Sequence, residues 1–449
     1  MSRRDLTHGA VQTRLTELTL PMVWGVFMVL SFYLADTYFI GLLGTQELAA
    51  ISFTFPVVSA TASLAMGLGV GALSVISRAI GRGDQEAVRR YATHSLVLAI
   101  FIVGIFVIIG LATIDPLFLA LGADPALLPM IRQYMEIWYA GMIFLIVPMV
   151  GNSIIRASGD SRLPSLIMTV AAVSNFILDP IFIFGLLGFP RLELQGAAWA
   201  SLVSRAITMV ASFYILHYRL KFIEFIRPSL RQLLQSWRAI LHIGLPAAGT
   251  NIITPILTGL LTVIIAKHGS VAVAAFGVAS RMEMFFLVPF VALSAGLGPF
   301  MGQNYGAKKQ NRLQEAVRLS TVFALMWGGF VALTLWFWGE EIAREINAEP
   351  QVVAYVAIYM ALIPVSYAAV GIVFTSSAAF NALANPMSAS MLAITRTFIL
   401  TVPMAWFGHV FWGMPGIFAA ISLANLTVGV VAYFWIRKKI TLKGGIHGE

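Results

Sequence analysis

The sequence predicts an all-α integral membrane protein with about twelve transmembrane helices in two parallel six-helix repeats. Three observations predict this fold: the composition, apolar segments along the whole chain, and a second half that repeats landmarks of the first. Only 11% of the 449 residues are charged and 59% are hydrophobic, whereas soluble domains contain about 25% charged residues. A soluble protein of this composition would lack the polar surface to cover itself. The composition therefore excludes an ordinary soluble enzyme and a disordered chain, and the absence of Cys excludes a disulfide scaffold.

The apolar segments are long enough to cross a bilayer as helices. Runs such as Leu96–Thr113 carry no charge and no alternation of polar and apolar residues, which argues against a membrane β-barrel. The first span is too long for the apolar core of a signal peptide, so we expect it to be retained. The expected spans are residues 17–42, 50–77, 91–114, 128–155, 164–187 and 196–216 in the first half, and 240–265, 273–301, 317–338, 352–380, 387–410 and 414–436 in the second.

Basic residues gather in alternate loops between these spans. If the N-terminus is cytoplasmic, most of the 29 Lys and Arg residues share its side, and the opposite loops hold Arg132, Arg191, Lys267 and Arg344. This bias predicts that both termini are cytoplasmic, in a bacterial inner membrane. It also explains the net charge of +9 without a nucleic-acid partner. We expect a monomer whose partners are membrane lipid and small organic molecules.

The two halves of the chain repeat each other. One constant shift in residue number, close to half the chain length, takes Leu20-Pro21 to Leu245-Pro246, and it also relates Gly44 to Gly269, Gly71 to Gly296, Gly81 to Gly306 and Ser95 to Ser320. We call it the repeat shift. Six helices per repeat give both halves the same membrane orientation. The sequence thus predicts an N-terminal bundle (residues 1–220), a cytoplasmic linker (221–238) and a C-terminal bundle (239–449). Two such bundles are the usual plan of a carrier that alternates its access.

Three acidic residues lie well inside the expected spans: Asp36, Asp179 and Glu283. An acidic side chain at the bilayer centre costs about 2.5 to 3.5 kcal/mol, so such residues tend to face the bundle interior and bind protons, ions or substrate. A structural hydrogen bond between helices is the alternative interpretation. For Glu283, a local ion pair with Arg281, two residues away, would suffice.

A polar residue lies close to Asp179 on the same expected helix. Asn175 precedes it by four residues and therefore shares its helical face. Pro180 has no N–H, so the carbonyl of Phe176 loses its helical partner. A free carbonyl beside a carboxylate predicts a proton or cation site, and a second acid facing it would oppose ionisation of either. The repeat shift takes Asp36 to Leu261, so we expect this coupling chemistry in the N-terminal half.

These residues resemble the multidrug and toxic compound extrusion (MATE) family. The resemblance rests on Pro21 and Asp36-Thr37 in the first span, on the Asn175-x-x-x-Asp179-Pro180 segment, and on the Gly302-Gln303-Asn304-Tyr305-Gly306 stretch. Within the family, the acids of the first and fifth helices are similar to those of the DinF-like branch, often described as proton-coupled. The resemblance implies two bundles in a V-shaped arrangement. It also implies alternating-access export of cationic or amphipathic organic compounds in exchange for H⁺ or Na⁺.

The resemblance also implies roles for individual residues. Cation or proton coupling, including any Na⁺ site, is expected at Asp36, Asn175, Asp179 and the hydroxyl of Ser201 in the sixth helix. The candidates for the substrate cavity are Asn152, Met168 and Tyr38, although Asn152 is also suited to joining helices. Conformational roles are expected for Pro21, about which the first helix would bend when Asp36 is protonated, and for Pro180, Arg281 and Glu283.

Two other functions compete with multidrug antiport. A lipid-linked oligosaccharide or polysaccharide flippase of the same superfamily would need several cationic side chains in its cavity, and only Arg205, Arg281 and Arg396 are candidates. A membrane-embedded enzyme or a channel is the third hypothesis. No Walker, GxSxG or HExxH motif is present, so we expect no ATP-driven transport, no catalytic activity, no cofactor and no resident metal. Neither the coupling ion nor the substrate leaves a motif.

Overall fold

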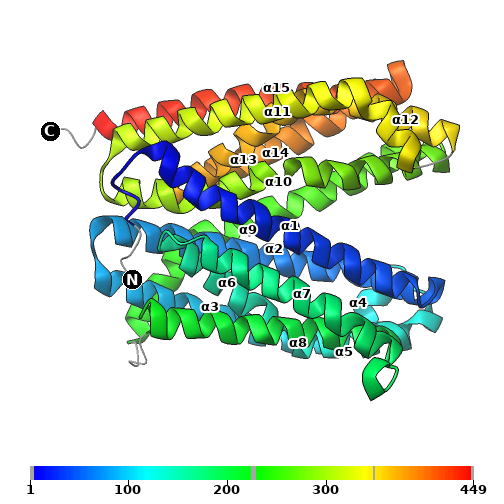
Figure 1. Cartoon of the computed structure of the whole chain (residues 1–449), viewed down its shortest axis with the longest axis horizontal. Helices are drawn as coiled ribbons and strands as arrows, with labels where there is room; N and C mark the ends of the chain where they lie inside the picture. The colour runs from blue at the N-terminus through cyan, green and yellow to red at the C-terminus, as the bar shows by residue number, and fades with distance from the viewer. Residues whose placement is uncertain (1–4, 224–228, 347–348, 446–449) are drawn as a thin grey trace. The chain divides into compact units, whose positions relative to one another are not determined.

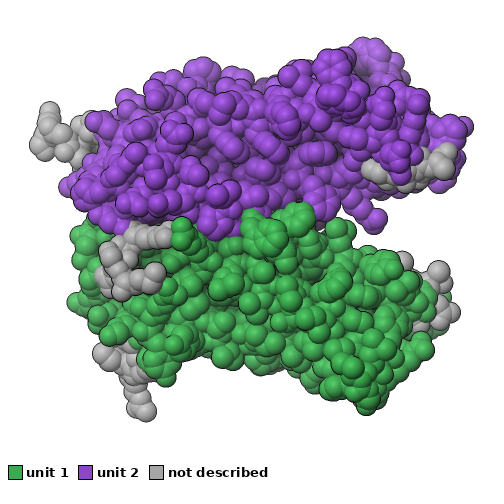
Figure 2. Space-filling model, viewed as in Figure 1, with its two compact units in different colours: residues 1–4, 24–248 green, residues 5–23, 249–449 purple. Residues whose placement is uncertain are grey.

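The computed structural model describes residues 5–223, 229–346 and 349–445, and this part of the chain is helical, without strands (Figure 1). It divides into two compact units (Figure 2). Among the described residues, unit 1 comprises residues 24–248, and unit 2 comprises residues 5–23 and 249–445.

The helices confirm the predicted repeat. The first repeat contains α1 (Val11–Gly41), α2 (Thr45–Arg82), α3 (Gln85–Ala112), α4 (Ile114–Ala120), η1 (Pro125–Leu127), α5 (Leu128–Ala140), α6 (Met142–Ala157), α7 (Arg162–Phe184), η2 (Leu186–Gly188), α8 (Glu193–Tyr214) and η3 (Ile215–Arg219). The second contains α9 (Leu230–Ala266), α10 (Ser270–Gly306), α11 (Gln310–Ile346), α12 (Pro350–Leu362), η4 (Pro364–Ser366), α13 (Tyr367–Ala382), α14 (Pro386–Ile394), η5 (Thr395–Thr401) and α15 (Val402–Gly445). The repeat shift takes the first residues of α2, α3 and α6 onto the first residues of α10, α11 and α13.

Ten helices in the described ranges are long and apolar enough to span a membrane, and α5 with α6, bent by 44°, make an eleventh span. One of the ten, Pro386–Thr441, has 56 residues. At 1.5 Å per residue it would be roughly 84 Å long, against a hydrocarbon core of about 30 Å. The helical geometry breaks at Gly413, and a Cβ on Gly416 would lie 2.2 Å from the carbonyl oxygen of Gly408. This close approach indicates that the run folds back as two spans, which brings the number to the expected twelve.

Two helices contribute to both units. Residues Val11–Val23 of α1 belong to unit 2 and the rest of α1 to unit 1, whereas α9 belongs to unit 1 up to Ala248 and to unit 2 thereafter. The two crossing points are repeat counterparts, because the repeat shift takes Trp24 to Gly249. The expected bundles were continuous in sequence, so this exchange differs from the predicted boundaries. Residues 224–228 of the predicted linker lie outside the described residues, and residues 230–238 form the start of α9.

Glycines allow α9 to pack closely on α2 within unit 1. A Cβ on Gly67 would lie 2.4 Å from the carbonyl oxygen of Gly244, and one on Gly71 would lie 2.4 Å from that of Ile240. Small residues at such crossings let helix backbones approach where lipid offers no hydrophobic driving force. The position of α9 therefore depends on these two glycines.

Polar side chains at the α10–α11 junction hold the N-terminal segment on unit 2. We call Gln303, Asn304, Lys309 and Arg312 the N-terminal clasp. The backbone N–H of Leu6 donates to Gln303 at 3.2 Å, Asn304 donates to the carbonyl of Leu6 at 3.1 Å, Lys309 donates to that of Thr7 at 2.8 Å, and Arg312 donates to those of Leu6 at 3.0 Å and Gly9 at 2.6 Å. The clasp gives the Gly302–Gly306 stretch a physical role, because Gln303 and Asn304 satisfy the backbone N–H and carbonyl of the buried Leu6.

A short side-chain turn shapes the segment that the clasp holds. Asp5 accepts hydrogen bonds from the backbone N–H and the hydroxyl of Thr7, at 2.7 and 2.6 Å, and its other oxygen lies 2.5 Å from His8 Nδ1. Partial burial would raise the pKa of Asp5, but the contacts with Thr7 and His8 outweigh it and lower the pKa from 3.8 to about 2. Asp5 therefore stays ionised, and the turn intact, at any physiological pH.

Replacing Arg312 with Met is expected to loosen the N-terminal segment. The change removes the donors to Leu6, Gly9 and Asn304. Asn304 is 0% exposed, and a buried acceptor left unpaired costs about 1 to 3 kcal/mol. We expect a lower thermal-unfolding midpoint in detergent and faster proteolysis before residue 11. Arg318→Met, at an exposed position of the same helix, is the matched control; equal stability of the two variants would contradict the clasp.

Candidate functional site

The second half of α1 packs closely on α7 in unit 1. The indole N–H of Trp24 donates to the hydroxyl of Thr169 at 3.1 Å. One residue later, a Cβ on Gly25 would lie 2.9 Å from the sulfur of Met168 and 3.1 Å from the Cα of Ser165. A side chain at position 25 would therefore push the two helices apart. Gly25 fixes the distance between α1, which carries Asp36, and α7, which carries Asn175 and Asp179.

The predicted coupling residues of α7 and α8 meet in the interior of unit 1. The two helices lie side by side (Figure 1). The amide nitrogen of Asn175 donates to Asp179 Oδ1 at 3.0 Å, as the four-residue spacing predicts. The same nitrogen lies 3.5 Å from the hydroxyl oxygen of Ser201 on α8. Asn175 and Asp179 are both 0% exposed. The structure thus brings together three of the four predicted coupling residues by hydrogen bonds.

Three oxygens of this site lack hydrogen-bond partners. They are Asp36 Oδ1, Asn175 Oδ1 and Asp179 Oδ2, and all three are buried in the described part of the structure. An unpaired buried acceptor costs about 1 to 3 kcal/mol, and more when it is charged. All three atoms accept and none donates, so a proton or a cation is the kind of ligand that would satisfy them.

Charges connect the fourth residue, Asp36, to this group. Asp36 interacts electrostatically with Asp179 of α7 and with Arg205 of α8. Tyr134 of α5 is 7% exposed and interacts with all three charged groups. The guanidinium of Arg205 also lies over the ring of Phe32, 5.9 Å from its centre.

We call Asp36, Tyr134, Asn175, Asp179, Ser201 and Arg205 the unit 1 cluster. Its two carboxylates and one guanidinium carry a formal charge of −1 when all three are ionised. One bound monovalent cation would make the cluster neutral, which a membrane interior favours. Among the described residues, no three His, Asp or Glu side chains gather as a metal-binding group. Any Na⁺ would therefore depend on amide, hydroxyl or backbone oxygens beside the two aspartates.

The predicted cavity residues have different surroundings. Asn152 on α6 accepts a hydrogen bond from Ser212 on α8 at 3.3 Å, which joins two helices of unit 1. Met168 fills the space beside Gly25. The structure does not bring Tyr38 to the unit 1 cluster, because Tyr38 is 64% exposed. The reason is geometric: residues two apart on a helix point in nearly opposite directions, so Tyr38 cannot share the face of Asp36.

The two prolines lie inside helices. Pro21 is in α1, shortly before the helix passes from unit 2 to unit 1 at Trp24. Pro180 lies one residue after Asp179 in α7, which continues to Phe184. Both remove a backbone N–H from the helical ladder. The bending role predicted for Pro21 stays a prediction.

Glu283 does not form the ion pair with Arg281 that was the alternative interpretation of this residue. In the described ranges no ion pair joins it to Arg281, which is exposed, because positions two apart on α10 lie on opposite faces. Instead, the hydroxyl of Tyr359 on α12 donates a short hydrogen bond to the Glu283 carboxylate, and Arg396 interacts with it electrostatically. The conformational roles predicted for Glu283 and Arg281 stay predictions.

Sequence reasoning missed Tyr134 and did not assign Arg205 to the site. A tyrosine in an apolar span carries no distinctive signal, and an arginine near a helix end is expected to extend to the membrane surface. The repeat contained a usable signal, because the repeat shift takes Tyr134 to Tyr359. Both tyrosines face acidic side chains.

Comparisons with known proteins cover nearly the whole chain. The family model described as MatE matches residues 21–181 and again residues 246–407, and the repeat shift relates the starts of the two matches. The FAD transporter of Shewanella oneidensis is 37% identical over 432 residues, which cover 96% of each chain. The probable multidrug resistance protein YpnP of Bacillus subtilis is 25% identical over 97% of each chain. The structure of the Vibrio cholerae MATE transporter VcmN in the bent form matches with a TM-score of 0.92 and 29% identity, covering 98% of this chain and 99% of that one.

Replacing Gly25 with Val is expected to disturb the site without touching a polar group. The new side chain would collide with Met168 and with the backbone of Ser165, and overpacking of this kind typically costs about 1 to 3 kcal/mol. We expect a lower thermal-unfolding midpoint and slower transport. Gly104→Val is the matched control, because a Cβ there meets nothing within 4 Å. If both variants behave alike, the packing of α1 on α7 does not determine the site.

Proposed function

Since the chain belongs to the MatE family of membrane transporters, we propose that it is a secondary active antiporter that exports organic compounds in exchange for H⁺. The observation that supports this most strongly is the set of three buried oxygens without partners, on Asp36, Asn175 and Asp179. Such unpaired acceptors favour the binding of a single cation, which would move inward across the membrane. Na⁺ is the alternative coupling ion.

The chemistry of the unit 1 cluster favours H⁺ over Na⁺. Protonation of one aspartate converts one unpaired acceptor into a donor, which can then pair with another of the three oxygens. A hard metal cation such as Mg²⁺ or Ca²⁺ takes about six oxygen ligands, and Na⁺ also binds oxygen ligands. The unit 1 cluster has three unpaired oxygens, which is fewer than such an ion takes. The neighbouring charges of Asp36 and Asp179 repel each other, so one shared proton relieves the repulsion at once.

The proposed coupling travels along α1. Protonation of Asp36 removes its attraction to Arg205 and its repulsion from Asp179. In the proposed cycle this changes the packing of α1 on α7 and opens unit 1 to substrate release on one side of the membrane. Pro21, which lacks a backbone N–H, weakens α1 near the residue where it passes from one unit to the other.

The substrate class has two candidates. The first is cationic or amphipathic organic compounds, because YpnP and other relatives are named multidrug resistance proteins. The second is flavin dinucleotide, favoured by the 37% identity to the FAD transporter over 96% of each chain. Two measurements on cells that express the protein distinguish these candidates. Flavin in the medium reports export of flavin dinucleotide, and resistance to cationic dyes reports export of cationic compounds. A lipid-linked oligosaccharide flippase, the competing function, is expected to change neither quantity.

The proposed setting is a bacterial inner membrane with both termini cytoplasmic. It rests on the concentration of basic residues in alternate loops. In this orientation the proton gradient of a respiring cell drives H⁺ inward, and the organic compound leaves.

Replacing Asp36 with Asn is expected to abolish coupled transport. Asn is close in shape to Asp but cannot bind or release a proton, so the cluster would lose one of its two titrating groups. We expect a drug-susceptible host expressing the variant to be as sensitive as the empty-vector strain.

The control variant is Glu86→Gln, which neutralises an exposed acid on α3. Resistance with Asp36→Asn that equals the wild type, at matched expression, would remove Asp36 from the coupling mechanism.

A further inference from the structure

Unit 2 contains its own tyrosine–carboxylate pair inside a span. Tyr359 of α12, the repeat counterpart of Tyr134, is 2% exposed and donates its hydroxyl to the carboxylate of Glu283. In unit 1 the acids come from α1 and α7, whereas in unit 2 the acid comes from α10. The repeat counterparts thus both interact with carboxylates, Tyr359 by a hydrogen bond and Tyr134 electrostatically, although the acids occupy unrelated positions.

The unit 1 cluster and the surroundings of Glu283 leave different kinds of polar atom without a partner. In the unit 1 cluster the three unpaired oxygens of Asp36, Asn175 and Asp179 are acceptors. Near Glu283, the buried atoms without partners are the Nε–H of Arg396 and the hydroxyl of Tyr367. A guanidinium N–H can only donate, and a tyrosine hydroxyl has a proton to donate. Unpaired donors favour an anion, just as unpaired acceptors favour a cation.

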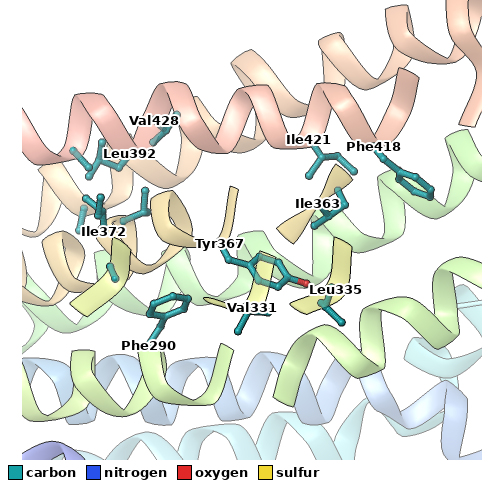
Figure 3. Close-up of a cluster of buried hydrophobic side chains, with 14 of the residues drawn as sticks. Phe290, Val331, Leu335, Ile363, Tyr367, Ile372, Leu392, Phe418, Ile421 and Val428 are labelled. Atoms are coloured by element: carbon teal, nitrogen blue, oxygen red, sulfur yellow. The ribbon is translucent and has the colours of Figure 1, made fainter. Parts of the chain in front are cut away.

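Three groups from three elements surround Glu283. They are Tyr359 from α12, Tyr367 from α13 and Arg396 from η5, and each interacts with the carboxylate by hydrogen bond or by charge. Tyr367 is 0% exposed. Figure 3 shows its ring among Val331, Leu335 and Ile363 in an apolar core.

The position of Arg396 is unusual in two respects. It lies in η5, a π-helical segment, and such segments occur frequently at functional sites. The hydroxyls of Thr397 and Thr401 on the same segment are also buried without partners. A purely structural arginine in a membrane would be expected to have its donors satisfied, because each unpaired donor there costs free energy.

We propose that unit 2 binds an anionic group of the exported molecule, a phosphate or a carboxylate, on Arg396 and Tyr367, and that Glu283 takes up a proton when this anion binds. The proposal rests on the proposed export function and deepens it by assigning an anionic group to the substrate. We call Glu283, Tyr359, Tyr367 and Arg396 the unit 2 cluster.

Charge balance gives the reason for the proton. Without ligand, Glu283 and Arg396 neutralise each other. An anion on Arg396 provides the guanidinium with a second negative partner, so the ionised carboxylate loses its compensation in a medium of low dielectric. One proton moves from water to a carboxylate oxygen of Glu283, no covalent bond of the ligand changes, and a singly charged anion leaves the cluster neutral. Tyr359 stays beside the carboxyl group as its hydrogen-bond partner.

The test uses two probes that share one aromatic ring system and differ by one phosphate, riboflavin and riboflavin 5′-phosphate. Binding to the purified full-length protein in detergent is followed by flavin fluorescence. Because charge-assisted hydrogen bonds to arginine are the strong ones, we expect the wild type to bind the phosphate at least about tenfold more tightly than riboflavin. Arg396→Met should remove this preference, so that the two probes bind with about equal affinity.

Two further variants make the result specific. Arg318→Met removes an exposed arginine of the same unit and should keep the preference. Glu283→Gln keeps an acceptor for Tyr359 but cannot be protonated. The measurement is made about one pH unit below the second pKa of the phosphate, which is about 6, so that the probe carries a single charge. In a weakly buffered solution with a pH indicator, the wild type should then take up about one proton per bound phosphate probe, and Glu283→Gln should take up none.

Equal binding of the two probes by the wild type, binding of neither probe, or a preference that survives Arg396→Met would overturn the proposal. Proton uptake by Glu283→Gln equal to that of the wild type would overturn the role of Glu283. These assays need no ion gradient, so they can fail while Asp36-dependent transport in cells succeeds, and the two proposals are distinguishable.

Discussion

A polar group inside a membrane has no water to replace a missing hydrogen-bond partner. This constraint explains both the helical structure of the chain and the small number of charged groups inside its spans. It forces the chain into helices, which satisfy their own backbone, and it makes each buried charge expensive. The charged groups that remain inside the spans are therefore informative. In unit 1 they are two aspartates beside an arginine, and in unit 2 they are a glutamate beside an arginine. Both groups leave specific atoms without hydrogen-bond partners, which is where a ligand gains most.

The two units share an architecture and differ in chemistry. The repeat shift relates helix starts, the two crossing points of α1 and α9, and a pair of tyrosines, Tyr134 and Tyr359. The three unpaired oxygens of Asp36, Asn175 and Asp179 in the unit 1 cluster are acceptors, whereas the unpaired Arg396 Nε–H in the unit 2 cluster is a donor. The repeat thus accounts for the shared helices, and acidic residues on different helices account for the cation site and the anion site that we propose. A carrier with both could couple proton movement to an amphipathic molecule that bears a negative group.

Much of the fold could be predicted from sequence, because composition, span length and the repeat are properties of the chain alone. The site could be predicted at Asp36 and Asp179, because an acidic side chain inside a membrane costs free energy. It could also be predicted at Asn175, because the four-residue spacing places it on the helical face of Asp179. The exchange of α1 and α9 between units could not, since an apolar helix carries the same pattern whichever neighbours it has. Tyr134 lacked a distinctive local signal. The alternative interpretation of Glu283, an ion pair with Arg281, is not found because helical geometry separates positions two apart.

The central claim is that the unit 1 cluster couples export to proton movement, and ion gradients imposed on proteoliposomes test it most directly. Wild-type protein and the Asp36→Asn/Asp179→Asn double variant would be reconstituted, and transport of a fluorescent organic cation followed under a pH gradient or a Na⁺ gradient alone. The account predicts transport by the wild type under the pH gradient and none by the double variant. Transport driven equally well by Na⁺ alone, or undiminished in the double variant, would contradict it.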